Sequence, residues 1–331
     1  HTRCGRDWSS DVCSSDLIRW AGNRNKEGPH IAMFCFAHGA DGLVFFDHQR
    51  DFYPRDTVGV AKLMDAMAEK KLQFESEPVT DGVAALYSMS SLWVTDAVTG
   101  SGRPYMVHFQ STVTTLDRMQ VLYNVYADRQ IEKGGVPDGV SVLMAPGAEA
   151  MNDTTLANIR AFVEDGGTLV TTPDFARVTR YGRSRPKAER DWIREFENVV
   201  ILDGEALDSW TANWQRGKYK MQRGLGWANK SLPKVAETLE PVISQEAPRT
   251  VRYLDGDGEM DARKTGARVC EDGTLYVFVD PWADEVQLEV RGAFESARNL
   301  YTDESLPVES TDAGTSRVRV DGGPAIVRFN P

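Results

Sequence analysis

Residues 139–173 carry the clearest fold signal in the chain and read GVSVLMAPGAEAMNDTTLANIRAFVEDGGTLVTTP. The apolar run at 140–144 predicts a strand that is buried on both faces and ends at the turn Ala145-Pro146-Gly147. Residues 168–172 predict a second strand of the same kind. Two such strands with a helix-length segment between them are typical of a parallel α/β unit.

The segment between these strands has the start and stop signals of a helix over 153–164. Asn152 or Asp153 is the expected N-cap, because a short polar side chain accepts from the free N–H groups of the first turn. Gly166-Gly167 is the expected stop signal. Residues 139–173 therefore predict a strand, a helix and a strand in order.

Neighbouring segments extend this pattern. Residues 83–87 and 199–202 are further strand candidates, and 78–82 is a break. A helix is expected over 116–132, with these residues on its apolar face: Met119, Leu122, Tyr123, Tyr126 and Ile131. The alternation of strands and helices predicts a doubly wound parallel sheet within residues 78–245.

Residues 30–46 (HIAMFCFAHGADGLVFF) predict an earlier αβ step, with a glycine turn leading into a buried strand at 43–46. An amphipathic helix is expected over 56–74, with one apolar side formed by Val60, Leu63, Met64, Met67 and Leu72. Ligand-contacting residues gather at the carboxyl ends of parallel strands. The candidate substrate-binding residues that follow this strand are Asp47, His48 and Arg50.

The chain changes character from about residue 246. Six short β-like runs follow, several separated by Asp-Gly turn signals, at 250–254, 267–270, 275–279, 286–290, 317–320 and 325–329. This pattern predicts a small antiparallel β-sandwich over 246–331.

Composition excludes several classes of protein. The chain has 331 residues and a net charge of −11, from 38 Lys+Arg and 49 Asp+Glu. An acidic balance argues against a general nucleic-acid partner, which would need a basic stripe. No apolar run approaches the roughly 20 residues of a membrane span, so no membrane partner is expected. There is no phosphate-binding glycine motif and no metal-ligand spacing of His or Cys, so we expect neither a cofactor nor a metal.

Residues 1–17 (HTRCGRDWSSDVCSSDL) have no hydrophobic period. The segment resembles translated adapter sequence, and we treat it as non-native; a natural disordered tail is the alternative. Two of the four cysteines, Cys4 and Cys13, fall in it, which leaves Cys35 and Cys270 as isolated thiols. If the segment marks a broken read, native sequence upstream of Ile18 is missing.

Three segments in fixed order resemble glycoside hydrolase family 42 β-galactosidases. AHGADGLVFF at 37–46 is similar to the step into the last strand of their (β/α)8 barrel, and residues 139–173 are similar to their middle domain. Residues 275–279 and 299–302 resemble their C-terminal β domain. The resemblance implies an α/β fold with three parts: a barrel remnant at 18–77, a flavodoxin-like (glutamine-amidotransferase-like) trimerisation domain at 78–245, and a small β-sandwich at 246–331.

The resemblance also implies a function. Such enzymes are retaining glycosidases, which need two carboxylates about 5 Å apart. In the family these follow the fourth and seventh barrel strands, upstream of residue 18, so no catalytic residue is expected in this chain. A carbohydrate substrate and a homo-oligomer, a trimer by resemblance, are implied. His48 stands where the family pattern has a tryptophan, so the resemblance does not determine which sugar is bound. The sequence does not determine the cellular compartment either.

The alternative function is a non-catalytic oligomerisation or carbohydrate-binding module. Five tryptophans are core residues or sugar platforms, namely Trp192, Trp210, Trp214, Trp227 and Trp282. A cationic cluster is either a solvated loop or a substrate-facing or intersubunit loop, and it consists of Arg177, Arg180, Arg183, Arg185, Lys187 and Arg190.

Two further motifs were weighed. The segment DGDGEMD at 255–261 superficially resembles a calcium loop, but it lacks the expected glycine and final glutamate, so a hairpin turn is favoured. Amidotransferase chemistry needs an activated cysteine with a histidine partner. The turn at 145–147 has no thiol, so amidotransferase activity is not expected.

Overall fold

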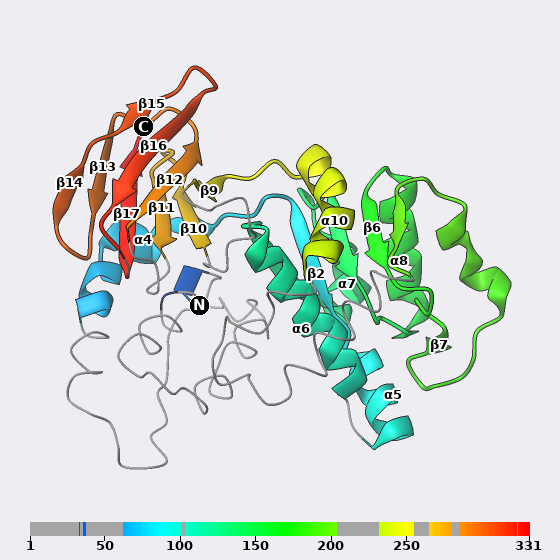
Figure 1. The fold of residues 1–331 in the computed structure, drawn as a ribbon. Helices are drawn as coiled ribbons and strands as arrows, with labels where there is room; N and C mark the ends of the chain where they lie inside the picture. The colour runs from blue at the N-terminus through cyan, green and yellow to red at the C-terminus, as the bar shows by residue number, and fades with distance from the viewer. Residues whose placement is uncertain are drawn as a thin grey trace, which may run out of the picture.

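The computed structural model describes residues 33, 36–37, 62–100, 103–203, 232–254, 265–279, 285–322 and 324–331 (Figure 1). Its helices and 3-10 turns are α4 (Lys70–Phe74), α5 (Met89–Thr99), α6 (Arg103–Arg118), α7 (Asp128–Gly134), α8 (Asp153–Glu164), η2 (Lys187–Glu189), η3 (Asp191–Arg194) and α10 (Leu232–Glu246).

The strands form a parallel region in the first half of the described chain and an antiparallel region in the second. The parallel set is β2 (Val83–Tyr87), β3 (Tyr123–Ala127), β4 (Val142–Ala145), β5 (Ala150–Met151), β6 (Thr168–Thr171), β7 (Val178–Thr179) and β8 (Val199–Ile201), and it is preceded by β1 (Ser76–Pro78), which pairs with the antiparallel strands. The second set is β9 (Val251–Tyr253), β10 (Thr265–Cys270), β11 (Leu275–Val279), β12 (Val286–Arg291), β13 (Ser296–Asn299), β14 (Glu304–Leu306), β15 (Glu309–Ser310), β16 (Thr315–Val320) and β17 (Ala325–Asn330).

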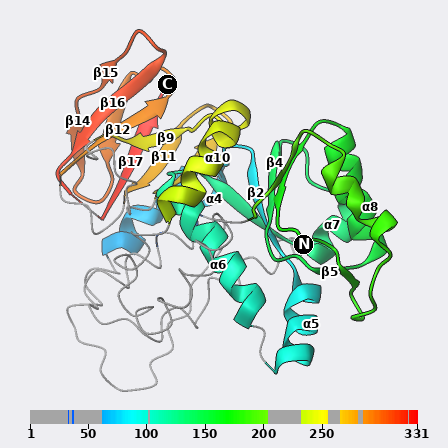
Figure 2. The same ribbon diagram turned by 45° about the vertical axis from the view of Figure 1, so that its right-hand side comes forward.

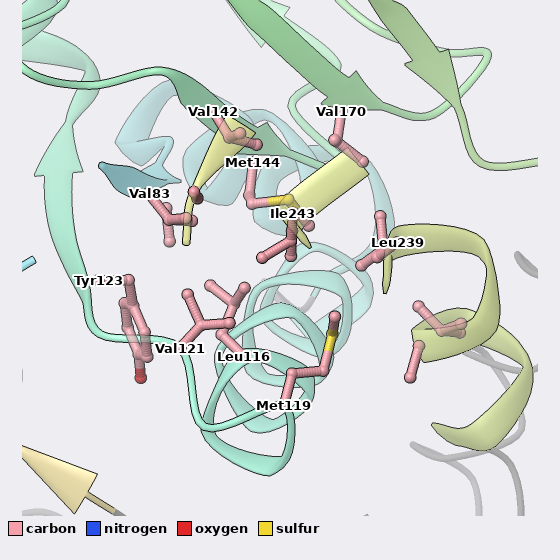
Figure 3. Packing of buried hydrophobic residues seen from close by; sticks show 14 of the residues in the cluster. Val83, Leu116, Met119, Val121, Tyr123, Val142, Met144, Val170, Leu239 and Ile243 are labelled. Atoms are coloured by element: carbon pink, nitrogen blue, oxygen red, sulfur yellow. The ribbon is translucent and has the colours of Figure 1, made fainter. Parts of the chain in front are cut away.

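A five-stranded parallel sheet has the order β3-β2-β4-β6-β8, which is 2-1-3-4-5 when its strands are numbered along the chain. Side chains on both faces are buried, as the apolar runs predicted. On one face, Val83 and Met144 pack against α6 and α10 (Figure 3). On the other face, Leu86 and Leu143 pack with residues of α7 and α8. The prediction of a parallel sheet with helices on both faces is therefore confirmed.

Helix α8 has the predicted bounds. The Asn152 side chain accepts a hydrogen bond from the Thr155 N–H over 2.6 Å, so Asn152, not Asp153, is the N-cap. Gly166 has a positive φ of 98°, and the Phe162 ring packs so closely on Gly167 that a Cβ there would clash with it, so these two glycines end the helix as expected.

The expected helix over 116–132 is wrong. Helix α6 ends at Arg118, residues 123–127 form β3, and α7 begins at Asp128. Gln120 takes a positive φ of 55° at the break, a conformation that no glycine announces in the sequence. Two of the apolar side chains that fitted one helix face, Tyr123 and Tyr126, belong instead to β3, which pairs with β2 along its whole length. Helices α5 and the first part of α6 were not predicted.

The expected helix over 56–74 is interrupted. Residues 62–67 are helical, Ala68 and Glu69 are not, and α4 begins at Lys70. Glu69 is an N-cap with extended backbone (ψ 124°), and its carboxylate pairs with Arg328 of β17 at 2.6 Å. Leu63, Met67 and Leu72 are buried as predicted, whereas Met64 is 44% exposed.

The second half of the described chain forms two antiparallel sheets. One has the order β1-β10-β11-β17-β13-β14 and the other β15-β16-β12-β9. They share one core, to which Val277 and Val327 contribute from the first sheet and Leu288 and Val318 from the second. The predicted sandwich is present, with one addition: β1 pairs with β10, and Ser76 lies opposite Cys270. Residues 76–78 therefore belong to the sheet of the C-terminal region.

Asp81 joins the two regions. It follows β1 and precedes β2, and its side chain is 7% exposed. Its Oδ2 accepts from the Leu122 N–H, while its Oδ1 accepts from the N–H and the hydroxyl of Thr250, all over 2.8 Å. One carboxylate thus connects the parallel sheet to the start of β9, the edge strand of the four-stranded sheet, which follows α10 along the chain (Figure 2).

Candidate functional site

The substrate-binding residues predicted from the sequence, Asp47, His48 and Arg50, lie outside the described residues. The strand at 43–46, Cys35 and the motif at 255–261 lie outside them as well. The candidate site among the described residues lies at the carboxyl ends of the parallel strands. Ligands of open α/β sheets bind there, next to the point at which the strand order reverses. Here that point lies between the carboxyl ends of β2 and β4.

The N-terminus of α5 faces this point, and the chain itself satisfies it. The Ser90 N–H donates to Oδ2 of Asp128 over 2.9 Å, and the Ser91 N–H donates to the Ser88 hydroxyl over 3.1 Å. Asp128 is 3% exposed and directly follows β3. A helix N-terminus attracts a phosphate or carboxylate, because its N–H groups are free and its dipole is positive there. In this protein Asp128 occupies that position.

The segment that enters β5 closes the same crevice. The Ala150 N–H donates to the Ser91 hydroxyl over 2.9 Å, and the Ala150 carbonyl accepts from the hydroxyls of both Ser88 and Ser91. Tyr105 of α6 adds a hydrogen bond from its hydroxyl to the Leu86 carbonyl. Protein groups thus fill the crevice that holds a ligand in other sheets of this strand order.

His108 lies beside the crevice, against the turn after β4. A Cβ added to Gly147 would lie 2.8–2.9 Å from three carbon atoms of His108, so the imidazole packs directly on the glycine backbone. The Nδ1 atom of His108 is buried and has no hydrogen-bond partner in the described part of the chain. Burial lowers the pKa of His108, and the nearby carboxylates of Glu149 and Asp174 oppose this shift only in part.

Glu149 is held by two partners. Its Oε1 accepts from the Thr95 hydroxyl over 3.2 Å, and its Oε2 pairs with Arg177 at 2.8 Å. A neutral imidazole beside a paired carboxylate can accept a proton, but nucleophilic chemistry also needs a thiol or activated hydroxyl. Cys270, the free cysteine within the described ranges, lies in β10 of the other sheet. The described residues therefore do not assemble an amidotransferase site.

The cationic cluster is largely paired within the chain. Arg177 pairs with Glu149, and Arg180 lies 3.5 Å from Glu132. The Arg185 side chain is 4% exposed; it pairs with Asp153 at 2.6 Å and donates to the Met151 carbonyl. Arg183 and Lys187 are exposed and Arg190 is partly buried. Three of the six side chains thus hold the 177–190 loop to the parallel-sheet region.

Trp192 is a core residue. It is 3% exposed and meets Phe175 and Phe196 edge to face. The other four tryptophans that were singled out lie outside the described residues. Trp93 on α5, which the sequence analysis did not single out, is 60% exposed.

The sequence did not predict the roles of three polar residues, and the reason is the same for each. Asp81, Asp128 and His108 act through partners that are distant in sequence, and no motif marks them. Within the described ranges, no group of three or more His, Cys, Asp or Glu side chains is placed to hold a metal ion. In the same part of the chain, no helix is long and apolar enough to cross a membrane.

Comparisons with known proteins agree with this fold. No protein-family model and no curated protein matches the chain in sequence. A catalytic mutant of Gan42B, a GH42 β-galactosidase from G. stearothermophilus, matches with a TM-score of 0.59 and 13% identity over 99% of this chain. The β-galactosidases from Bacillus circulans sp. alkalophilus (15% identity, 92% of this chain) and Rahnella sp. R3 (13%, 93%) each match with a TM-score of 0.57.

The chain shares the fold of the GH42 β-galactosidases, as the resemblance predicted. It spans 58% of the length of Gan42B and 52% of the other two enzymes. The likeness therefore concerns a little more than half of each of those proteins.

Proposed function

We propose that the chain is the C-terminal part of a retaining glycoside hydrolase of the β-galactosidase type, and that it lacks both catalytic carboxylates. The observation that carries the proposal is the asymmetry of the structural match, which covers nearly all of this chain and little more than half of each enzyme. In this proposal residues 18–77 end a (β/α)8 barrel. Residues 78–245 form a flavodoxin-like domain, which the 2-1-3-4-5 strand order supports.

The two buried acids among the described residues, Asp81 and Asp128, do not form a catalytic pair. Retaining hydrolysis needs two carboxylates about 5 Å apart that can reach a sugar. Asp81 and Asp128 are buried and bonded to backbone N–H groups. Asp81 precedes β2, and Asp128 follows the neighbouring parallel strand β3. The two acids therefore lie at opposite ends of these strands, about one strand length apart. Both have structural roles.

The upstream reading frame tests this proposal. We expect roughly 300–400 additional residues with strand and helix alternation and two glutamates at strand ends, because a whole barrel needs about 250 residues. In the extended protein, replacing either glutamate by glutamine should abolish hydrolysis of an aryl β-galactoside. A start codon close to Ile18 would contradict the proposal and favour a non-catalytic module.

The second candidate function is an oligomerisation module, and the exposed end of α5 favours it. Trp93 and Val98 on this helix are 60% and 79% exposed, so both apolar side chains are accessible to a partner surface. We expect a homo-oligomer, a trimer by resemblance, with carbohydrate as the substrate of the whole protein. Light scattering on the chain and its Trp93→Ser variant tests the assembly, with Tyr181→Ser, another exposed aromatic position, as the control. If the parent chain and the Trp93→Ser variant are both monomers, assembly through α5 is contradicted.

A further inference from the structure

A hollow of about 200 Å³ lies where the chain leaves α10 and enters the four-stranded sheet. Its walls come from the connection after α10 and from side chains of β9 and β12 and the first residue of β16. The lining residues are Pro248, Arg249, Thr250, Arg252, Glu289, Arg291 and Thr315. Three guanidinium groups thus line one small hollow in a protein whose net charge is −11.

Arg249 is fixed before any ligand arrives. Its side chain is 8% exposed, and its Nε donates to the Met119 carbonyl over 2.6 Å. Its two terminal nitrogens donate to the two oxygens of Glu240 over 2.9 and 2.6 Å. This pairing fixes the guanidinium plane and leaves one N–H on each terminal nitrogen for another acceptor.

Arg252 and Arg291 bring positive charge to the hollow, and Arg252 lies opposite Glu289 where β9 pairs with β12. Arg291 donates from Nη2 to the Arg249 carbonyl over 2.9 Å, which holds it at the wall of the hollow. Within the described ranges, no carboxylate lies within ion-pair distance of Arg252 or Arg291. The acid that lines the hollow, Glu289, is bound by Arg317 through Nε and Nη2 at 2.9 and 2.8 Å. Arg317 therefore already compensates the charge of Glu289.

We propose that this hollow is an oxyanion-binding site, which takes a sulfate, phosphate or carboxylate group through Arg249, Arg252 and Arg291. Guanidinium groups present planar sets of donors that match such anions, and a fixed guanidinium loses little freedom on binding. The anion has two sources, a free inorganic ion or a charged group on a sugar. The site contains none of the catalytic residues of the proposed glycoside hydrolase, so this proposal does not depend on that function.

Binding of radiolabelled sulfate to the 331-residue chain, measured by equilibrium dialysis at constant ionic strength, tests the proposal. We expect one saturable site. Arg252→Gln and Arg291→Gln should each weaken it roughly tenfold, the effect of losing one hydrogen bond to a charged group. Arg291→Lys should weaken binding less than Arg291→Gln, because it keeps the charge but loses the fork. The matched control is Arg319→Gln on the neighbouring strand, whose side chain pairs with Glu285 outside the hollow, and it should bind as the parent does.

Competition separates the two sources of the anion. Sodium galacturonate and galactose 6-sulfate displace sulfate at lower concentration than inorganic phosphate if the site takes charged sugars, and neutral galactose displaces none. Equal displacement by inorganic phosphate identifies a site for free anions. Binding that is absent, that does not saturate, or that Arg252→Gln and Arg291→Gln leave unchanged would overturn the proposal.

Discussion

Asp81 and Thr250 are 169 positions apart in the chain and are joined by two hydrogen bonds of 2.8 Å, from the N–H and the hydroxyl of Thr250 to one carboxylate oxygen. The other oxygen of Asp81 accepts from Leu122, so one buried side chain connects the parallel sheet to the antiparallel sheets.

Replacing Asp81 by Asn should destabilise the protein by about 1–3 kcal/mol, the cost of a buried group that loses its partner. The Asn oxygen keeps the bonds to Thr250, but its NH₂ group then faces the Leu122 N–H, donor against donor. Urea unfolding with a fluorescence readout measures the change. Asp312→Asn, at an exposed position, is the control and should lie within about 0.5 kcal/mol of the parent. Equal midpoints for the two variants would show that Asp81 does not stabilise the junction.

Gly147→Ala should cost more stability than Gly100→Ala. The two glycines have φ values of +70° and +69°, so the backbone penalty of about 1–2 kcal/mol is the same. No atom lies within 4 Å of a Cβ at Gly100, whereas a Cβ at Gly147 meets His108 at 2.8 Å. Overpacking there should add about 1–3 kcal/mol. In the double variant His108→Ala with Gly147→Ala this added cost should shrink but not vanish, because the contacts with the imidazole carbons are lost while the contact with the Cβ of residue 108 remains. A purely additive result would contradict the contact with the ring.

Asp128→Ala should destabilise the protein by about 1–2 kcal/mol, because it leaves the Ser90 N–H at the start of α5 without its acceptor. Asp128→Asn keeps an acceptor oxygen and should cost less than half as much. Thermal unfolding at low and high salt distinguishes the charge from the hydrogen bond. If Asn proves as costly as Ala, the carboxylate is not a capping group.

Stability should fall between pH 6.5 and pH 5, in part because of His108. Burial lowers the pKa of this imidazole below its ordinary value of 6.5, so the unfolded chain binds the proton more readily than the folded protein. The contribution of His108 is therefore fully present above pH 6.5 and is lost as the pH falls toward the lowered pKa. His108→Gln does not titrate, so its free energy of unfolding should decline less over this range. Parallel pH profiles for the two proteins would contradict the lowered pKa.

Local signals in the sequence predicted the elements whose boundaries they determine. Helix α8 has its expected bounds because Asn152 caps it and Gly166-Gly167 ends it. The bounds of β2 and β11 agree with the apolar runs at 83–87 and 275–279. In each case the deciding residues lie within or next to the element.

The predictions from the sequence were wrong or missing where residues distant in the chain determine the structure. Tyr123 and Tyr126 have side chains that fit a helix face, and the pairing of residues 123–127 with β2 makes this segment a strand. Residues 76–78 join a sheet because of β10, which lies about 190 positions later. The contacts of His108 with Gly147 and of Asp128 with Ser90 also link separate elements, so no local pattern contains them. The predicted residues Asp47, His48 and Arg50 stay a prediction.

The most direct test of the proposed function is the hydrolysis of p-nitrophenyl β-galactoside by the purified, folded 331-residue chain. Our account predicts no hydrolysis above the rate in buffer, because the chain supplies neither the acid/base nor the nucleophilic carboxylate. Saturable hydrolysis that is abolished by replacing a single Asp or Glu of this chain would contradict it.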